Sequence, residues 1–560
     1  MKPGVPLFAA ALAALAAVAA APRPPAFPAA DRVFLGGRIW TADPSRPRAQ
    51  ALALAGDAIV AVGTDPEVRR YVGPATQTVD LRGRFVAPGF NDAHLHFLVV
   101  ENADLTGAAS VEEVQGRIRA YAAAHPDQAW VTGRGWVYGA FPGSLPDRRQ
   151  LDAAVADRPA FMTSYDGHSA WANSKALQMA GITRDTRDPD HGVIVRDEKG
   201  EPTGALKESA SRLVGRLLPP ASAEDRYAAL KRRLEEAASY GLTSAQNASI
   251  AAADVAAYER VAAEGGLKVR FYFALPMVKD IAADDLAHYK AMRTKYPGPL
   301  MKFGAVKGFV DGVVESRTAA MLEPYPGGGT GELNWTSDDL DRTVVLYDRE
   351  GFQVFLHAIG DKAIRMALDA YERAAQANGT SGRRHRVEHI EAPTRADIAR
   401  FKPLGVVAST QALFANPDQN TYEVYAPTLG PDRESRAMAF RSLDEAGAVQ
   451  AFGSDSPVFS MEVLRGIYCA ATRMTPEGTP PGGWQPQERI SAEAALRHFT
   501  RDAAYASFEE QRKGTLAPGM LADLVVLSDD VVAIPPAQIL KTRVLLTVMG
   551  GRDTYRAGDF

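Results

Sequence analysis

Cysteine is almost missing from this chain of 560 residues, which contains only Cys469. A single cysteine forms no intrachain disulfide, so the fold has to be stable without such bridges. The sequence also lacks the C-x-x-C pair, the H-E-x-x-H helix, the G-x-x-x-x-G-K-S/T phosphate loop and the G-x-S-x-G nucleophile elbow. These absences remove the main support for a zinc-ribbon, metalloprotease, P-loop or serine-hydrolase function.

Neither sign of charge dominates the chain, because 63 Lys and Arg residues are balanced by 67 Asp and Glu residues. No long Lys/Arg run is present, which argues against a nucleic-acid partner. The hydrophobic content of 46% and the charged content of 23% are ordinary for globular proteins. The length allows more than one domain, although a barrel with insertions can occupy most of such a chain.

One long apolar run stands out, the alanine-rich stretch Leu7–Ala21, which follows the positive start Met1-Lys2. Its end, Ala19-Ala20-Ala21, fits an A-x-A cleavage site, and the run is too short for a comfortable membrane span. We therefore interpret residues 1–21 as an export signal, with an uncleaved anchor as the alternative. The expected location is periplasmic or secreted, without stable membrane insertion after cleavage.

Both ends of the chain show short apolar runs punctuated by glycine turns, a pattern typical of β-strands. We expect residues 22–86 and 504–560 to form one composite β-sandwich domain. The strands predicted there are Arg32–Leu35, Ala51–Leu54, Ala58–Gly63, Ala522–Leu527 and Val544–Met549.

Residues 87–503 alternate apolar strands with amphipathic helices, for example a helix over Ala221–Tyr240 followed by a strand at Gly241–Ala245. Repeated βα units predict an α/β fold, a (β/α)8 TIM-like barrel. The stretch of about 100–235 is too long for one βα unit. We interpret it as an insertion after the first barrel strand that forms a lid or side domain over the site, or alternatively an independent domain without a catalytic role.

Polar residues with metal-binding chemistry lie in or after the predicted strands. His94 and His96 stand at positions i and i+2 of an extended segment, which point to the same face. Imidazole is a common metal ligand, but a lone H-x-H pair is a weak signal. The other residues of this kind are Lys307, His357, His389 and Asp455. Taken alone, each of these residues could be an ordinary hydrogen-bonded or paired core residue. The carboxyl ends of barrel strands converge on one mouth, so the residues together predict a metal site there.

As an ordered set, these motifs resemble the amidohydrolase superfamily, in particular the branch called amidohydrolase family 3, which includes N-substituted formamide deformylases. The resemblance covers nearly the whole chain after the signal. The stretches that carry it are Ala87–His96, Asp166–Ser174, Lys307–Gly312, His357–Asp361, Glu388-His389, Gly453–Asp455 and Gly514–Leu527.

The resemblance implies a barrel with a terminal β-sandwich and one or two divalent metal ions, with zinc as the favoured ion. It further implies that His94, His96 and Asp455 bind the first ion, and that His357 and His389 bind the second.

Lys307 resembles the family lysine that bridges both ions after carbon dioxide has carbamylated its amine. Carbamylation is needed because a free ammonium group has donors only and cannot ligate a metal. Lys302 and Lys207 are the alternatives, but Lys302 begins its strand and Lys207 lies outside the strand series.

The expected reaction is attack of metal-activated hydroxide on a carbonyl carbon, with Asp455 as the catalytic residue that passes a proton to the leaving amine. Substrate-binding candidates are His168 and Trp171 in the insertion and Arg317, which can hold a carboxylate bidentately. Alternatively, Trp171 belongs to the core and Arg317 pairs with a neighbouring glutamate.

The sequence thus predicts an exported metal-dependent hydrolase of C–N bonds in amides, formamides or cyclic amides, acting on a small molecule. An esterase or lactonase on the same site is the first alternative. A metal-loaded binding protein without turnover is the second, and Asp455 argues against it, since binding alone needs no proton shuttle. The oligomeric state stays open, a homo-oligomer included.

Overall fold

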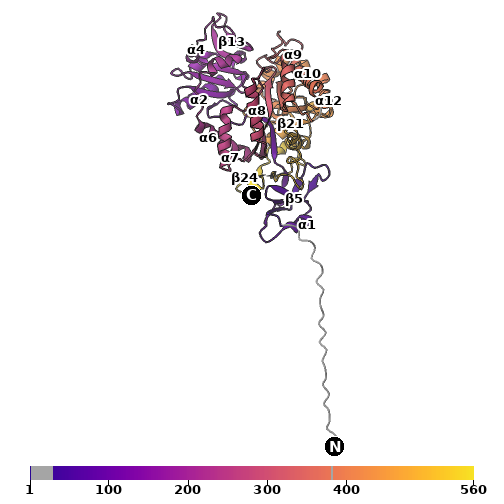
Figure 1. The fold of residues 1–560 in the computed structure, drawn as a ribbon. Helices are drawn as coiled ribbons and strands as arrows, with labels where there is room; N and C mark the ends of the chain where they lie inside the picture. The colour runs from indigo at the N-terminus through magenta and orange to yellow at the C-terminus, as the bar shows by residue number, and fades with distance from the viewer. Residues whose placement is uncertain (2–28, 380–381) are drawn as a thin grey trace.

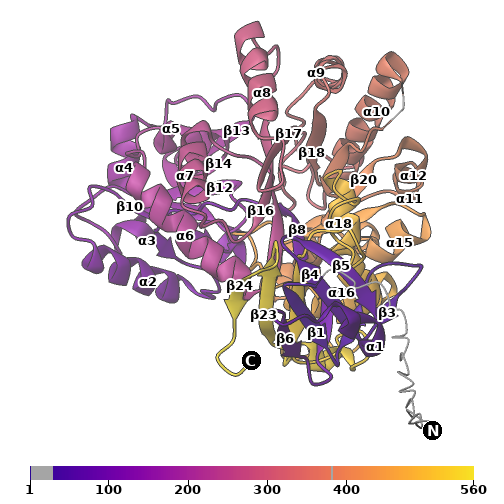
Figure 2. The ribbon, with the colours of Figure 1, turned by 60° about the horizontal axis from the view of Figure 1, so that its bottom comes forward.

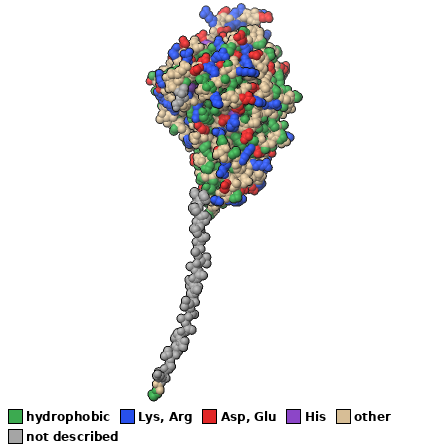
Figure 3. Space-filling model, turned by 90° about the vertical axis from the view of Figure 1, so that its right-hand side faces the viewer, with side chains coloured by type: hydrophobic (Ala, Val, Ile, Leu, Met, Phe, Trp, Pro, Cys, Tyr) green, Lys and Arg blue, Asp and Glu red, His purple; other side chains and the backbone are tan. Residues whose placement is uncertain are grey.

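A computed structural model of the protein describes residue 1, residues 29–379 and residues 382–560. The predicted export signal, residues 1–21, lies outside the described residues except for Met1. Within these described ranges, no helix combines the length and the apolar character needed to cross a membrane. Basic and acidic side chains intermingle over the face of the molecule in Figure 3, as expected for a net charge of −4.

The centre of the molecule is a parallel sheet of eight strands in the order β21-β20-β19-β18-β17-β16-β15-β8, around which helices such as α8 and α10 lie in Figure 2. The predicted TIM-like barrel is thereby confirmed. Its strands are β8 (Phe90–Leu95), β15 (Leu242–Asn247), β16 (Arg270–Pro276), β17 (Met301–Phe309), β18 (Gln353–Ala358), β19 (Arg386–His389), β20 (Val407–Gln411) and β21 (Gln450–Gly453).

The barrel is nearly closed where β21 approaches β8. Gly453 makes this approach feasible, because a Cβ atom there would lie 2.5 Å from the backbone nitrogen of His94. The backbone N–H of Asp455 donates to the carbonyl of His94 at 2.7 Å. Any side chain larger than glycine would therefore separate the two strands that carry part of the predicted site.

The outer helices form because apolar residues recur at helical spacing and polar residues cap the ends. In α10 (Asp361–Asn378), Ala363, Ala367 and Ala370 are among the buried residues and form a stripe toward the strands. In α6 (Ala223–Ser239), Ser222 and Asp225 form a capping box at the first turn. The other long helices around the barrel are α7 (Ala252–Ala263), α8 (Ala283–Lys295), α9 (Ser337–Arg349) and α16 (Val463–Thr472).

Both chain ends contribute to one sheet of six strands, in the order β24-β23-β22-β7-β2-β3. Here β7 (Phe85–Pro88) pairs with β22 (Leu524–Leu527) and with β2 (Arg38–Trp40). The remaining strands are β3 (Arg48–Ala49), β23 (Val544–Met549) and β24 (Arg552–Arg556), and a second sheet contains β1 (Arg32–Leu35), β4 (Ala51–Ala55), β5 (Ala58–Gly63) and β6 (Gln77–Asp80).

The segment before the two histidines consists of two strands that belong to different sheets. Gly89 divides it, so that β7 lies in the end sheet and β8 in the barrel, and the end-sheet pairing continues to Pro88, past the boundary expected after residue 86. A Cβ atom at Gly89 would lie 2.2 Å from Thr243 Oγ1. The glycine therefore lets the chain pass closely over β15 as it changes sheets.

The insertion after β8 folds as a separate sheet beside the barrel, seen with α2 and α4 at the upper left of Figure 1. Its own core includes the fully buried Trp136, Tyr138 and Trp171. The last residue of its sheet is Glu208. The next long helix, α6, packs against α7 and β15 and so belongs to the barrel. The elements of the insertion are β9 (Ala103–Asp104), α2 (Val111–Ala124), β10 (Val131–Trp136), α3 (Arg148–Asp152), β11 (Ala160–Ser164), β12 (Ser169–Ala172), α4 (Ser174–Ala180), β13 (Gly192–Arg196) and β14 (Pro202–Glu208).

A buried ion pair joins the barrel to the end sheet, and breaking it should destabilise the protein. Arg270 donates to both carboxylate oxygens of Asp523, at 2.7 and 3.0 Å. We expect Arg270→Ala to destabilise the protein by about 3–5 kcal/mol, because it leaves a buried carboxylate unpaired. Urea unfolding measures this change, with Arg543→Ala, which removes an exposed partner of Asp559, as the control without effect. Equal unfolding midpoints for Arg270→Ala and wild type would contradict the prediction.

Candidate metal centre

The predicted ligand residues lie at the carboxyl ends of the barrel strands. His94 is on β8, His357 is on β18 and His389 is the last residue of β19. Asp455 follows β21, and His96 follows β8 rather than lying on it, with its backbone N–H bonded to the carbonyl of Ser456 at 2.6 Å. Sequence segments far apart in the chain therefore present imidazole and carboxylate groups at one mouth.

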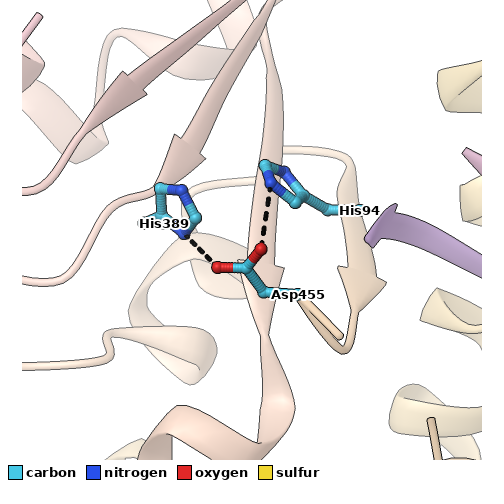
Figure 4. A group of neighbouring side chains, drawn as sticks. All are labelled: His94, His389 and Asp455. Carbon is cyan, nitrogen blue, oxygen red and sulfur yellow. Dashed lines mark ion pairs between the residues drawn. The ribbon is translucent and has the colours of Figure 1, made fainter. Parts of the chain in front are cut away.

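Asp455 lies between the imidazoles, as Figure 4 shows for His94 and His389. Its Oδ1 is 3.4 Å from His94 Nε2 and 3.5 Å from His96 Nε2, and its Oδ2 is 3.9 Å from His389 Nδ1. One donor atom from each of His94, His389 and Asp455 lies within 4.8 Å of the other two. This set of two imidazoles and a carboxylate fits the ligand chemistry of zinc and similar divalent ions.

Two further predicted ligands border this group. The ring centre of His357 is 4.6 Å from that of His389, and its Nε2 is 3.0 Å from the carbonyl oxygen of Gly312. The Lys307 Nζ is 3.4 Å from His94 Nε2.

Of the lysines considered from the sequence, only Lys307 contacts these imidazoles. Lys302 donates to the carbonyl of Ser507, and Lys207 donates to the carbonyl of Ser316.

Burial determines the protonation of the imidazole, amine and carboxyl groups at this centre. It lowers the pKa of His94 and of His389 well below the usual range, and the charge of Lys307 lowers both further. Both imidazoles are therefore neutral, the form that ligates a metal. Burial also lowers the pKa of Lys307 and raises that of Asp455, while the charge of each group opposes the shift of the other. Burial thus favours the neutral forms of both the amine and the carboxyl group.

The backbone adopts an uncommon conformation at two of the candidate ligands. His389 has a φ of 76° and Asp455 has a φ of 55°, in the left-handed region, where residues other than glycine are strained, aspartate and histidine less than most. Such strain persists only where surrounding contacts hold it, and it concentrates at functional sites. At Asp455, the hydrogen bond to His94 supplies one of these contacts.

Comparison with known proteins identifies the family. A family model described as the amidohydrolase family matches residues 77–555. The chain belongs to the amidohydrolase family. This amidohydrolase is a metal-dependent hydrolase that acts on carbon–nitrogen bonds, and the resemblance inferred from its motifs is confirmed.

Individual relatives match almost the whole length of this chain. The chain is 31% identical to "Protein LONG AFTER FAR-RED 3" of Arabidopsis thaliana, over 95% of this chain and 92% of that protein. It is 28% identical to an N-substituted formamide deformylase of Arthrobacter pascens, over 93% and 97%. The solved structure of an uncharacterised metal-dependent hydrolase from Pyrococcus horikoshii OT3 has a TM-score of 0.71, with 25% identity, over 90% of this chain and 99% of that chain.

The amidohydrolase also contains a buried charged pair beneath the site, and the sequence motifs did not reveal this pair. Arg386 donates to both oxygens of Glu388, at 2.8 and 2.9 Å, and the Glu388 carboxylate also contacts His94 Nδ1. An ionised carboxylate only accepts, so the proton of His94 lies on Nδ1 and its Nε2 is free to ligate. The i, i+2 spacing of Arg386 and Glu388 on β19 was the available signal, since it places both on one face.

The three substrate-binding candidates occupy different surroundings. His168 lies over His357, with ring centres 5.1 Å apart. Trp171 has no exposed surface, and its indole N–H donates to the carbonyl of Asp147. Arg317 is exposed, and its guanidinium approaches the loop at Gly327. The structure therefore brings His168 to the candidate ligands, whereas Trp171 packs inside the insertion.

Aromatic residues beside the site were also missed from the sequence. Phe414 is nearly parallel to the His389 ring at 5.9 Å, and Phe459 lies 5.3 Å from Phe414. Tyr165, from the insertion, lies 6.4 Å from Phe459. All three side chains are partly exposed. They come from separate segments, Phe414 from a short 3-10 helix, and no local motif links them, so only the fold reveals this aromatic surface.

The contact between Glu388 and His94 leads to a prediction for metal affinity. We expect Glu388→Gln to weaken metal binding by about 10–100-fold, because residues that orient a ligating histidine have effects of this size. Competition with a chromogenic chelator measures the affinity. Glu224→Gln, which alters an exposed partner of Arg260, is the control and should bind metal as wild type does. Wild-type affinity in Glu388→Gln would show that His94 needs no such orientation.

Proposed function

We propose that this amidohydrolase is an exported enzyme that hydrolyses the C–N bond of a small amide, formamide or cyclic amide. The observation that carries this proposal is the convergence of His94, His389 and Asp455, with donor atoms within 4.8 Å of one another, at the mouth of the barrel. The similarity to an N-substituted formamide deformylase supports the formamide class. The signal-like segment Met1–Ala21 supports export to the periplasm or the medium.

The ligand chemistry supports zinc as the ion, since imidazole nitrogens and carboxylate oxygens are its usual ligands beside thiolate. In this proposal His94, His96 and Asp455 hold one ion, and His357 and His389 hold a second. When bound, such an ion polarises a carbonyl group and lowers the pKa of water to about 7.

In this proposal Lys307, as a carbamate, would supply anionic oxygen ligands to the metal centre. Burial lowers the pKa of its amine, which raises the fraction of the neutral form that reacts with carbon dioxide. Free ammonium in the same place would repel a cation.

Asp455 is the proton carrier in the proposed reaction. It takes a proton from the attacking water and gives it to the amine nitrogen, whose bond to the carbonyl carbon then breaks. Its position between the imidazoles, with a side chain only 10% exposed, limits exchange of that proton with bulk solvent. The aromatic surface of Phe414, Phe459 and Tyr165 beside His389 suits an apolar substituent of the substrate.

The substrate class is tested with a panel of amides, formamides, cyclic amides, esters and lactones, with and without a chelator. We expect hydrolysis of C–N substrates that the chelator abolishes and added zinc restores, because the proposed chemistry needs a bound divalent ion. Turnover of esters and lactones alone would assign the site to the alternative reaction. Absence of turnover on the whole panel by metal-loaded protein would overturn the proposed function.

The role of Asp455 predicts a selective defect. We expect Asp455→Asn to reduce kcat by about 10²–10⁴-fold, the range typical for loss of a general acid–base group. Metal content, measured by elemental analysis, should fall far less, because the imidazoles remain. Asp432→Asn, at a side chain that is 93% exposed, is the matched control and should keep wild-type kcat. Turnover close to wild type in Asp455→Asn would contradict the proton-carrying role.

A further inference from the structure

A carboxylate from the insertion holds one ring nitrogen of His168. His168 Nδ1 is 2.9 Å from Glu208 Oε2, and Thr318 Oγ1 donates to Glu208 Oε1 at 2.6 Å. Both carboxylate oxygens therefore accept, and Nδ1 carries the proton of this contact. Within residues 29–379 and 382–560, the side-chain hydrogen bond of His168 is made through Nδ1, which leaves Nε2 as the atom available to a ligand.

The conformation of Glu208 is costly, and several contacts maintain it. Its φ of 49° lies in the left-handed region, and its backbone N–H donates to the carbonyl of His168 at 2.8 Å. A Cβ atom at Gly312 would lie 2.3 Å from Glu208 Oε1 and 2.1 Å from Thr318 Oγ1. The glycine thus leaves the space in which the carboxylate meets the threonine. Neighbouring Lys207 adds a contact, to the carbonyl of Ser316.

These contacts connect the insertion with the candidate metal centre. Thr318 lies on the loop after β17, the strand of Lys307, and Gly312 in the same loop accepts from His357. The His168 ring lies 5.1 Å from the His357 ring at an interplanar angle of 35°. Its side chain is 14% exposed, so it is enclosed but reachable. A buried histidine with one nitrogen committed to a carboxylate has a defined orientation for the other.

We propose that Glu208 is a positioning residue for the hydrolysis: it holds the ring of His168 so that Nε2 contacts the substrate beside His357, and Thr318 holds Glu208 in turn. This inference rests on the proposed function for its kinetic consequences. A purely structural role, in which Glu208 only fastens the insertion to the barrel, predicts a different result when Glu208→Ala and His168→Ala are combined.

The test is a double-mutant cycle on the full-length, metal-loaded protein, with the best amide of the substrate panel. We expect Glu208→Ala to lower kcat by about 10–100-fold with much smaller changes in KM and metal content. His168→Ala should lower kcat at least as much, and the double variant should lose no more than His168→Ala, because Glu208 acts through His168. Glu208→Gln should recover most of kcat, since its amide can accept from Nδ1–H and still contact Thr318.

Glu201→Ala is the matched control, since Glu201 lies in the same insertion and pairs with Arg184 on its surface. It should retain wild-type kinetics. Losses that multiply in the double variant would overturn the inference, and so would wild-type kcat in Glu208→Ala. A Glu208→Gln variant as impaired as Glu208→Ala would also overturn it, because orientation alone would then not explain the effect.

A second measurement does not depend on turnover. In protein labelled with ¹⁵N-histidine, a hydrogen-bonded Nδ1 proton of His168 should give a downfield resonance that is missing from His168→Asn. We expect this resonance to disappear in Glu208→Ala and to persist in Glu201→Ala. Its persistence in Glu208→Ala would overturn the positioning role even if the chain hydrolyses amides. Failure of the wild-type protein on the substrate panel, with this resonance behaving as expected, would instead overturn only the proposed function.

Discussion

The contact of the Glu388 carboxylate with both Arg386 and His94 is the interaction on which the site depends. Arg386 has no exposed surface and also donates to the carbonyl of Ala93 and to Ser409 Oγ, so it joins three strands at the centre of the barrel. A buried carboxylate is costly unless it is paired, and the guanidinium supplies that pairing. The same carboxylate sets the proton position of His94. The core of the fold and the chemistry of the site therefore share one side chain.

The insertion extends this arrangement beyond the barrel. The barrel strands supply the imidazoles and the carboxylate of the candidate metal centre, but His168 and Tyr165 come from the separate sheet beside it. The insertion is tied to the loop after β17 by Glu208 and Lys207, and to Glu315 of that loop by the Tyr165 hydroxyl. Because loops of a barrel tolerate change while its strands stay in place, substrate preference can vary in the insertion without disturbing the ligands.

Local pattern explains why part of the site was predictable. His94, His357 and His389 lie in or at the end of apolar strands, and parallel strands bring such positions to one mouth. Contacts between distant segments were not predictable in this way. Glu388 and His94 are 294 positions apart, and Thr318 and Glu208 are 110 apart.

The insertion was harder to interpret for a different reason. Its sheet has a core of its own, so apolar residues there point either to that core or to the site, and the sequence does not distinguish the two. The aromatic ring of Trp171 packs against Phe141 in this core, with centres 5.3 Å apart. The neighbouring His168 instead lies over His357. His168 ends the turn before β12 and Trp171 lies on that strand, and the Glu208 contact holds His168 at the site.

The position of the ligands at the seam of the barrel links metal binding to stability. The hydrogen-bonded sheet order ends at β21 and β8, and these strands are held together by contacts at the site, from Asp455 N–H to His94 and from Ser454 N–H to Asp92. Asp455 belongs to one side of this seam and His94 to the other. An ion held by both, as proposed above, would therefore bridge the last gap of the barrel. Since ligands that bind only the folded state stabilise it, an ion held in this way would offset part of the cost of the positive φ at Asp455.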